Sequence, residues 1–281
     1  MVVSVRADSP AEKAGIRPGD IVKTIDGRHT RPLAPPLGER LTKGAPGSTV
    51  KISLLRPGSE PIDTSVVRER LVPAPPTSRT LEDGTGYVRV REFVEGTADE
   101  VRGLVEALKK TGVSKLVLDL RGAGRGQHTE GIKLAEVFVA KGSVVAKLTS
   151  AHRPERLFSS DGTLHAWDQP VAVLTDNGTA GPGEIVAAAL KDAGRGPVVG
   201  EQTFGRAAVQ RLVPIEKGGL ILTVAKYASP KGEPLHGRGV EPTAVVETTP
   251  DDAKPGEATP DAVLEKALEL LGPAAQEKKA A

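Results

Sequence analysis

The stretch from residue 171 to residue 194 constrains the fold of this chain more strongly than any other. Its apolar start, Val171 to Leu174, indicates a buried strand, and a turn-rich segment follows at 176–183. The apolar spacing of residues 184–193 then predicts a helix, with Gly194 as its C-terminal stop. A strand that enters a helix through a glycine-rich turn can expose one reactive side chain and direct backbone N–H groups at an anion. An ordinary turn between a strand and a helix has the same pattern, so this stretch alone leaves the function open.

The composition indicates a globular protein and excludes several functions. Of the 281 residues, 38% are hydrophobic and 26% are charged, and the formal net charge is only +2. This balance predicts no nucleic-acid-binding face, and at 2% the aromatic residues are too few to provide a base-stacking surface. No apolar run approaches the roughly 18 residues of a transmembrane helix. The absence of cysteine excludes disulfides and thiol chemistry, no histidine or carboxylate group has metal-ligand spacing, and we expect no metal and no cofactor.

Residues 1–56 indicate a small module. Residues 9–16 predict a helix with Ser9 as its N-cap and Glu12 at the capping-box position. Short strands are expected at 2–5, 21–25 and 49–55. The sequence Ser-Pro-Ala-x-x-Ala-Gly-Ile-x-x-Gly-Asp, which begins at Ser9, resembles the PDZ modules of bacterial proteases.

The PDZ resemblance implies that this module binds the C-terminus of a polypeptide as an added strand, with a glycine-rich loop holding the carboxylate. Such a loop would precede Val2 and is absent from the sequence, so a partial PDZ-like domain with a packing role is the alternative. Prolines at 32, 35 and 36 interrupt the region where the second PDZ helix is expected, and we place the groove wall at 33–42. The residues expected to contact a peptide are Val2, Val3, Val5, Leu37 and Leu41.

The rest of the chain alternates strands and helices. Residues 57–80 are rich in proline and arginine and predict a linker that carries one strand at 64–67. Residues 81–247 predict βαβ units with right-handed crossovers, and residues 248–281 predict a tail with an amphipathic helix at 261–271. Strands of the central part are expected at 86–90, 115–120, 143–148, 171–174 and 197–199, and in a hairpin at 210–215 and 220–225. Its helices are expected at 97–112, capped by Thr97, at 131–139 and at 184–193.

Several motifs of this central part, in the right order, resemble those of the carboxyl-terminal processing peptidases, also called tail-specific proteases. The turn at 179–184 falls on the family's Thr-Ala-Ser-Ala-Ser-Glu, and residues 200–210 fall on its Gly-Glu-x-Thr-Phe-Gly-Lys-Gly-x-x-Gln. Further matches lie at 86–90, 119–121 and 227–242. The resemblance implies a mixed α/β fold, in which a small PDZ-like β/α module precedes a crotonase-like α/β core. It also implies a periplasmic or otherwise extracytoplasmic protein, although no signal peptide is predicted because a strand-like segment follows Met1 directly.

The residues that the resemblance assigns to catalysis are changed. The family's nucleophilic serine falls on Gly181 and its lysine base on Arg206, whereas its glutamine is kept as Gln210. Gly181 has no hydroxyl, and the guanidinium of Arg206 stays protonated and cannot accept a proton. Pro182 has no N–H to donate to an oxyanion. The resemblance places the oxyanion-binding groups at Gly124, Arg125, Gly126 and Pro182, with Arg125 in place of a glycine.

Gly181 and Arg206 together favour a catalytically inactive homologue, a pseudoprotease that binds polypeptide C-termini or a protein partner. Arg206 and Arg125 are a candidate anion site in such a protein. One alternative is an active serine-type endopeptidase that cleaves near C-termini with a non-standard nucleophile. Another is a structural module that forms homo- or hetero-oligomers through the helix at 261–271.

The alternative nucleophiles are hydroxyl groups near the changed site or in the loop 149–169. Thr179 is expected to satisfy a turn, and the loop is expected to be a polar surface lid because nothing fixes the spacing of its residues. His128, after the glycine loop, is expected to be exposed. The loop candidates are Ser159 and Ser160, with His152 or His165 and with Asp161 or Asp168.

Overall fold

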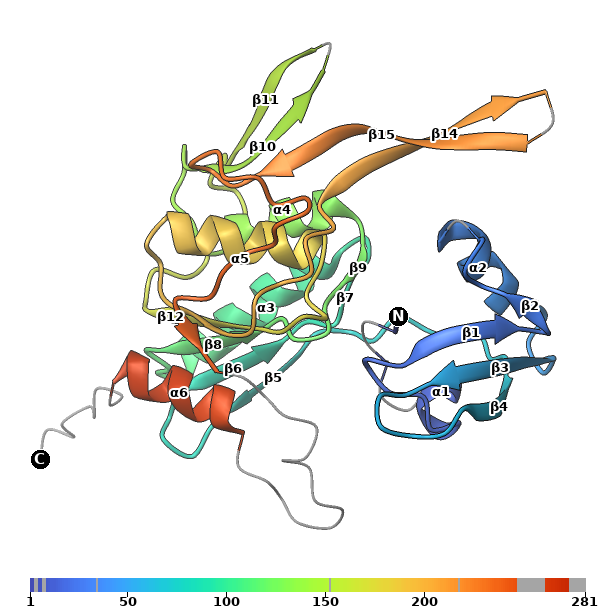
Figure 1. Ribbon diagram of the computed structural model, residues 1–281. Coiled ribbons are helices and arrows are strands. Elements are labelled where there is room, and N and C mark those ends of the chain that lie inside the picture. The colour runs from blue at the N-terminus through green and yellow to red at the C-terminus, as the bar shows by residue number, and fades with distance from the viewer. Residues whose placement is uncertain are drawn as a thin grey trace, which may run out of the picture. The chain divides into compact units, whose positions relative to one another are not determined.

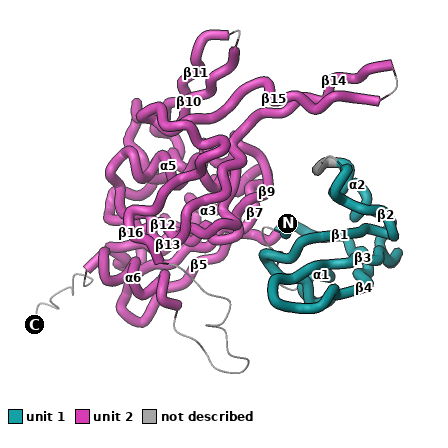
Figure 2. Tube along the Cα trace, in the orientation of Figure 1, with its two compact units in different colours: residues 1–73 teal, residues 74–281 magenta. Residues whose placement is uncertain are grey.

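The computed structural model describes residues 1–2, 5–6, 9–33, 35–151, 153–216, 218–246 and 261–272. The chain forms two compact units, residues 1–73 and residues 74–281 (Figure 1, Figure 2). The stretch 57–80, for which the sequence predicts a linker, is divided between them, because each unit takes one strand from it. Within the described ranges, no helix is long and apolar enough to cross a membrane.

Unit 1 is a four-stranded antiparallel sheet with two helices. The sheet has the order β2-β1-β3-β4 and consists of β1 (Ile21–Ile25), β2 (Arg28–His29), β3 (Thr49–Leu55) and β4 (Ile62–Val67). The helices are α1 (Pro10–Lys13) and α2 (Pro35–Thr42). The side chain of Ser9 accepts a hydrogen bond from the Glu12 N–H at 3.3 Å, which confirms the predicted N-cap. Alternate residues of β3 point inward, and Val50, Ile52 and Leu54 form the centre of the core.

Unit 2 is built around a six-stranded sheet. Its order is β16-β13-β12-β8-β6-β5, with β5 (Thr77–Thr80), β6 (Gly86–Arg89), β8 (Leu116–Asp119), β12 (Val171–Thr175), β13 (Val198–Gly200) and β16 (Ala244–Val245). All neighbours are parallel except β5, which pairs antiparallel with β6 at the edge. Every residue of β8 and β12 is buried, as the continuous apolar runs predict.

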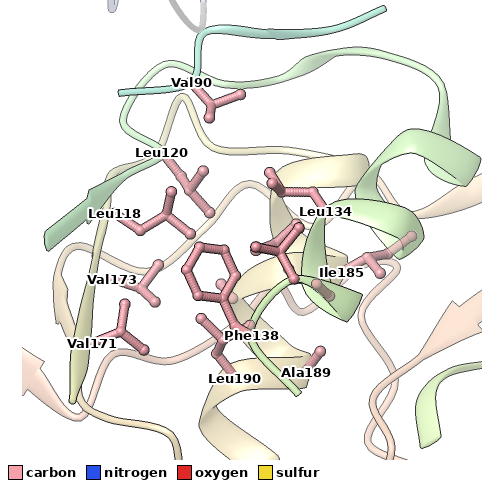
Figure 3. Packing of buried hydrophobic residues seen from close by; sticks show 14 of the residues in the cluster. Val90, Leu118, Leu120, Leu134, Phe138, Val171, Val173, Ile185, Ala189 and Leu190 are labelled. Atoms are coloured by element: carbon pink, nitrogen blue, oxygen red, sulfur yellow. The ribbon is translucent and has the colours of Figure 1, made fainter. Parts of the chain in front are cut away.

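Helices cover both faces of this sheet. Neighbouring strand residues point to opposite sides, and because the central strands β8 and β12 are almost entirely apolar, both faces need to be covered. One face carries Leu118 and Val173 and packs against the helices α3 (Thr97–Lys110), α4 (His128–Glu136) and α5 (Pro182–Asp192). Figure 3 shows this layer, in which Phe138 and Leu190 lie against the strand residues. The other face carries Val117 and Leu174 and packs against α6 (Ala262–Leu271). Figure 1 shows α6 on the opposite side of the sheet from α3 and α5.

A second sheet of unit 2 carries a long two-stranded ribbon. Its order is β11-β10-β15-β14, with β10 (Val144–Ser150), β11 (Arg153–Ser159), β14 (Ala208–Ile215) and β15 (Gly218–Ala228). Only residues 226–228 of β15 pair with β10, so the rest of the β14–β15 hairpin extends as a ribbon (Figure 1). The short strands β7 (Glu92–Phe93) and β9 (Arg125–Gly126) form a separate parallel pair. The predicted surface lid at 149–169 therefore contains most of a strand hairpin rather than only loop.

Several element boundaries differ from the sequence-based predictions. The N-cap of α3 is Gly96 rather than Thr97, whose hydroxyl instead accepts a hydrogen bond from the Val94 N–H at 3.0 Å. Helix α4 begins at His128, three residues before the predicted start, and its N-cap Gln127 makes no side-chain capping bond. The predicted tail 248–281 lies largely outside the described residues, apart from Asp261 and α6 with Gly272.

Candidate functional site

The turn between β12 and α5 has a conformation that favours glycine at position 181. Gly181 is the N-cap of α5, with φ 54° and ψ −109°, and the Gly183 N–H donates to the Ala180 carbonyl at 3.1 Å. These are the angles and the closing hydrogen bond of a type II′ turn, in which an L side chain at the first central residue is strained. Space itself does not exclude a side chain, because the nearest atom to a Cβ there would be Nε2 of His128, at 3.4 Å.

A buried carboxylate, that of Glu184, fixes the turn against the segment 203–206. Its Oε2 atom accepts hydrogen bonds from the N–H groups of Gly181 at 2.7 Å and Arg206 at 2.8 Å. Its Oε1 atom accepts from the Thr203 hydroxyl at 2.7 Å and the Gly205 N–H at 2.5 Å. Glu184 therefore sets the distance between positions 181 and 206. Its place at the third helical position and at the end of the 179–184 motif is a sequence signal for this role, which the predictions above do not use.

Arg206 connects this segment to the glycine loop. Its Nη2 atom donates to the Gly124 carbonyl at 2.6 Å, while the residue as a whole is exposed. Only glycine fits at 124, since a Cβ there would lie 2.8 Å from the Gly178 carbonyl oxygen. A guanidinium in this position supplies positive charge and N–H donors, and it cannot act as a general base.

His128 lies at the first position of α4 and faces the turn. Its ring stacks on Tyr227, with 4.9 Å between the centroids and 23° between the planes. Burial, and secondly the charge of Arg206, lowers the pKa of this imidazole, which favours its neutral form. Its Nε2 atom is buried and has no hydrogen-bond partner within the described residues. The prediction of an exposed loop residue is therefore wrong, because the helix starts earlier and Tyr227 covers one face of the ring.

The remaining loop and glutamine positions are more open. Arg125 and Gly126 are exposed and form β9, whose register places Arg125 beside Glu92 of β7. Gly126 has φ 118°, and a Cβ there would lie 2.1 Å from the Phe93 carbonyl oxygen, so the pairing requires glycine. Gln210 is exposed in β14, opposite Thr223. The structure thus brings Gly181, Pro182, Gly124 and Arg206 together. Gln210 lies in the β14–β15 ribbon, near its base.

The alternative nucleophiles are engaged elsewhere. The Thr179 hydroxyl is buried, accepts from the Asp176 N–H at 3.1 Å and donates to the Leu120 carbonyl at 2.9 Å, so it satisfies the turn as predicted. Ser160 is also buried and accepts from the Gly162 N–H at 3.2 Å. His165 contacts Asp168 at 2.7 Å. Across the described part of the loop, no hydrogen bond joins Ser159, Ser160 or Asp161 to a histidine; His152 lies outside the described residues.

The peptide-contact residues expected in unit 1 serve mainly its own packing. The Val2 N–H donates to the Asp20 carbonyl at 2.7 Å, and the Val2 carbonyl accepts from the Gly19 N–H at 2.8 Å. Val2 and Val5 lie in no strand, which corrects the prediction of a strand at 2–5, and Val3 lies outside the described residues. Val2, Val5 and Leu41 pack against the core of unit 1, whereas Leu37 on α2 is 41% exposed.

The start of the glycine loop is tied to the C-terminal helix through buried charges. Asp119, at the end of β8, accepts hydrogen bonds from the Tyr87 hydroxyl at 2.5 Å and from Nη2 of Arg121 at 2.7 Å. The same Nη2 atom donates to Asp261 at 2.8 Å, and Asp261 caps α6 by accepting from the Leu264 N–H at 3.1 Å. Burial raises the pKa values of both carboxyls, but hydrogen bonds and ion pairs, chiefly with Arg121, outweigh it and hold both below their ordinary value.

This network is expected to make unit 2 sensitive to acid. Because the folded pKa values of Asp119 and Asp261 are depressed, their contribution is complete above about pH 4 and is lost as the pH falls through the folded values. Asp261→Asn keeps an N-cap but loses the ion pair, and should lower stability at pH 7 by up to about 1 kcal/mol. Melting temperatures measured from pH 6 down to pH 2 should fall less steeply for this variant below about pH 4. Parallel curves would show that the Arg121–Asp261 pair contributes nothing.

Within the described residues, no cluster of three or more histidine, aspartate or glutamate side chains could hold a metal ion. Residues 84–246 match the family profile described as peptidase family S41, and residues 1–56 match that of the PDZ domain. The S41 match covers more than half of the 281 residues.

This chain belongs to peptidase family S41. It is 32% identical over 255 residues to the carboxy-terminal processing protease CtpA of Bacillus subtilis, covering 90% of this chain and 54% of that protein. It is also 32% identical over 246 residues to a probable CtpA-like serine protease of Staphylococcus haemolyticus, covering 86% of this chain and 49% of the relative. The chain thus spans about half the length of the curated relatives it matches.

Solved structures of S41 proteins have the same fold. The photosystem II D1 C-terminal processing protease superposes with a TM-score of 0.76 at 31% identity, covering 88% of this chain and 67% of that one. A putative S41 protease from Bacteroides fragilis superposes with a TM-score of 0.59 at 20% identity, covering 95% of this chain and 76% of that one. The predicted family, the PDZ module and the mixed α/β protease fold are therefore confirmed.

Proposed function

We propose that this S41 chain is a pseudoprotease, which binds polypeptide C-termini or a protein partner and does not cleave them through a serine–lysine mechanism. One observation carries the proposal: the helix-start turn that can present a nucleophile holds Gly181 followed by Pro182. A glycine supplies no nucleophilic atom, and a proline supplies no N–H for an oxyanion.

The arrangement of Arg206 supports the same proposal. A lysine base must lose its proton to accept one from a serine, whereas a guanidinium remains charged at every accessible pH. The guanidinium of Arg206 instead donates a hydrogen bond to the Gly124 carbonyl and so connects the segment 203–206 to the glycine loop. Glu184 holds the turn at Gly181 next to Arg206, whose guanidinium supplies hydrogen-bond donors suited to binding a ligand. The same turn lacks the nucleophile and the base that acyl transfer needs.

Proteolysis and binding of one unfolded reporter with an apolar C-terminus test the proposal. The chain is compared with the variant Gly181→Ser/Pro182→Ala/Arg206→Lys, which restores the three missing groups together. We expect the unaltered chain to bind the reporter without cleaving it, and the variant to cleave it. Binding is followed by fluorescence anisotropy and cleavage by mass spectrometry. Cleavage by the unaltered chain would contradict the proposal. A failure to bind any unfolded polypeptide would contradict binding of polypeptide C-termini and leave a folded protein partner as the ligand.

A further inference from the structure

One edge of the second sheet of unit 2 has no partner strand. Strand β14 lies at the end of that sheet, on the far side of β15 from β10, and no described strand pairs with its outer side (Figure 1). The Ala207 carbonyl accepts a hydrogen bond from the Tyr227 N–H at 2.9 Å, so the backbone of this residue faces β15. Because backbone groups alternate between the two sides of an antiparallel strand, every second residue of β14 from Ala208 onward faces outward. The register shift in the ribbon does not alter this order, since its extra residue, Val224, lies on β15.

The outward backbone groups of β14 form what we call the open edge. Ala208, Gln210 and Leu212 each present an N–H and a carbonyl there, whereas Pro214 presents only a carbonyl. Hydrogen-bond pairing with an added strand can therefore extend from Ala208 to Leu212, and it ends at the proline. This stretch is the base of the ribbon, and it begins two residues after Arg206.

The ribbon is apolar on both faces beside the open edge. Leu212 lies opposite Ile221 on one face, and Val213 lies opposite Leu220 on the other. Leu212 is 65% exposed, and Leu220 and Ile221 are exposed as well. A two-stranded ribbon has little stability of its own in water, so apolar side chains exposed on it indicate a partner. Because both faces are apolar, the partner that fits has apolar side chains at successive positions, and folded proteins bury such a stretch.

The other edge of the same sheet is protected against strand pairing. Strand β11 begins with Arg153, Pro154, Glu155 and Arg156, all of them exposed. Charged side chains and proline on an edge strand prevent pairing with another chain. In β14 the only charged residue is Arg211, and the proline comes after the stretch that can pair. The contrast between the two edges of one sheet indicates that the open edge accepts a strand.

We propose that the open edge binds an unfolded, apolar stretch of polypeptide as an added antiparallel strand. Antiparallel pairing continues the pattern of the whole sheet, and the main-chain hydrogen bonds supply affinity. The C-terminal end of the bound stretch then lies beside Ala208, at the base of the ribbon. This inference rests on the proposed function, since it states how the chain holds the polypeptide that it binds.

A second copy of the chain fits the open edge poorly. Its own pairing stretch would be the same base of the ribbon, so two copies would have to meet base to base. Next to that base the Gly181 and Arg206 N–H groups both donate to Glu184, which belongs to the body of unit 2. Two bodies would therefore compete for the space beside the strands, whereas an extended polypeptide adds only the spacing of one strand, about 4.8 Å.

Two substitutions at Leu212 isolate its outward N–H group. Leu212→Pro and Leu212→Ala both remove the exposed side chain, but only proline also removes the N–H from the open edge. We expect Leu212→Pro to bind an apolar, fluorescently labelled peptide about tenfold more weakly than Leu212→Ala does, because one hydrogen bond is lost and the ring hinders the approach of the strand. Fluorescence anisotropy measures both affinities, and thermal unfolding shows whether both variants are folded.

Amide hydrogen exchange in the unaltered chain, followed by NMR, provides a second readout. The N–H groups of Ala208, Gln210 and Leu212 face outward, and they should exchange about tenfold more slowly when the peptide is bound, since they then donate to it. The N–H groups of Val209 and Arg211 already face β15, so their exchange should change much less.

The outcomes separate this inference from the proposed function. Equal affinities of the two folded variants, or outward amides that the peptide does not slow, would overturn the inference while binding without cleavage still stands. If Leu212→Pro does not fold, the exchange measurement decides. Cleavage of the peptide by the unaltered chain would contradict the proposed function and leave the strand addition intact. A peptide that does not bind would contradict the inference and leave a folded protein partner for the proposed function.

Light scattering tests the second copy as the occupant. We expect the unaltered chain and Leu212→Pro to have the same mass in solution. A dimer that becomes a monomer in Leu212→Pro, with the affinity for the peptide unchanged, would assign the open edge to a second copy and overturn the inference.

Discussion

The single substitution Gly181→Ser is expected to make this chain react covalently with a serine-directed phosphonate. The new Cβ would lie 3.4 Å from Nε2 of His128, which brings the serine hydroxyl within hydrogen-bonding reach of that atom. Burial and Arg206 lower the pKa of His128, so the neutral imidazole can accept the hydroxyl proton. We expect the labelling rate to exceed that of the unaltered chain by about a hundredfold or more, as positioned general bases give. Intact-mass measurement of the labelled protein over time checks this result.

The histidine dependence of the labelling is the decisive control. Gly181→Ser/His128→Phe should label at the background rate, whereas Gly181→Ser/Lys266→Gln should label like the single variant. Labelling that does not depend on His128, or that requires Arg206→Lys, would contradict the expectation. Hydrolysis of peptides should stay low in the single variant, because Pro182 still offers no oxyanion donor, a loss that costs about a hundredfold or more. The strained φ at residue 181 should also destabilise this variant by about 1–3 kcal/mol, measurable by urea unfolding.

Local sequence patterns were sufficient to predict the strands and helices whose apolar residues follow a clear pattern. The apolar runs at β8 and β12 predict strands that are buried on both faces, and the structure has them so. The amphipathic pattern before Gly272 predicts α6, and Asp261 is its cap. These elements follow from periodicity and capping, which a short window of sequence contains.

The environment of His128 could not be predicted in this way. Its helix begins without a capping side chain, so no local signal places the residue inside α4. The ring is covered by Tyr227, and its Nε2 atom faces Gly181, two contacts that are distant in sequence. The sequence predicts a strand at 64–67 but assigns it to a linker, whereas the structure has β4 at Ile62–Val67 as part of unit 1, because it pairs with β3. Long-range contacts of this kind override local composition.

Glu184→Gln is expected to be the most damaging conservative substitution near the site. The carboxylate accepts hydrogen bonds from three backbone N–H groups and from the Thr203 hydroxyl, and Glu184 is fully buried. An amide has one acceptor oxygen, and its NH₂ group would face at least one of these N–H donors in either orientation. The unsatisfied donors and the lost charge should together cost about 3 kcal/mol of unfolding free energy. For a domain of this size the melting temperature should fall by roughly 6–12 °C.

Glu130→Gln is the matched control, because Glu130 is also buried but, among the described residues, accepts hydrogen bonds only from Lys133 at 2.9 Å and from the Ala98 N–H at 3.3 Å. Glu130→Gln should lower the unfolding free energy and the melting temperature clearly less than Glu184→Gln does in the same urea and thermal experiments. Equal losses would mean that burial of a carboxyl, and not the shared acceptor, sets the cost. Because Glu184 accepts from both the Gly181 N–H and the Arg206 N–H, its substitution should also weaken binding of the unfolded reporter at temperatures where the variant is still folded. If binding stays unchanged until the protein melts, other contacts must hold residues 181 and 206 next to each other.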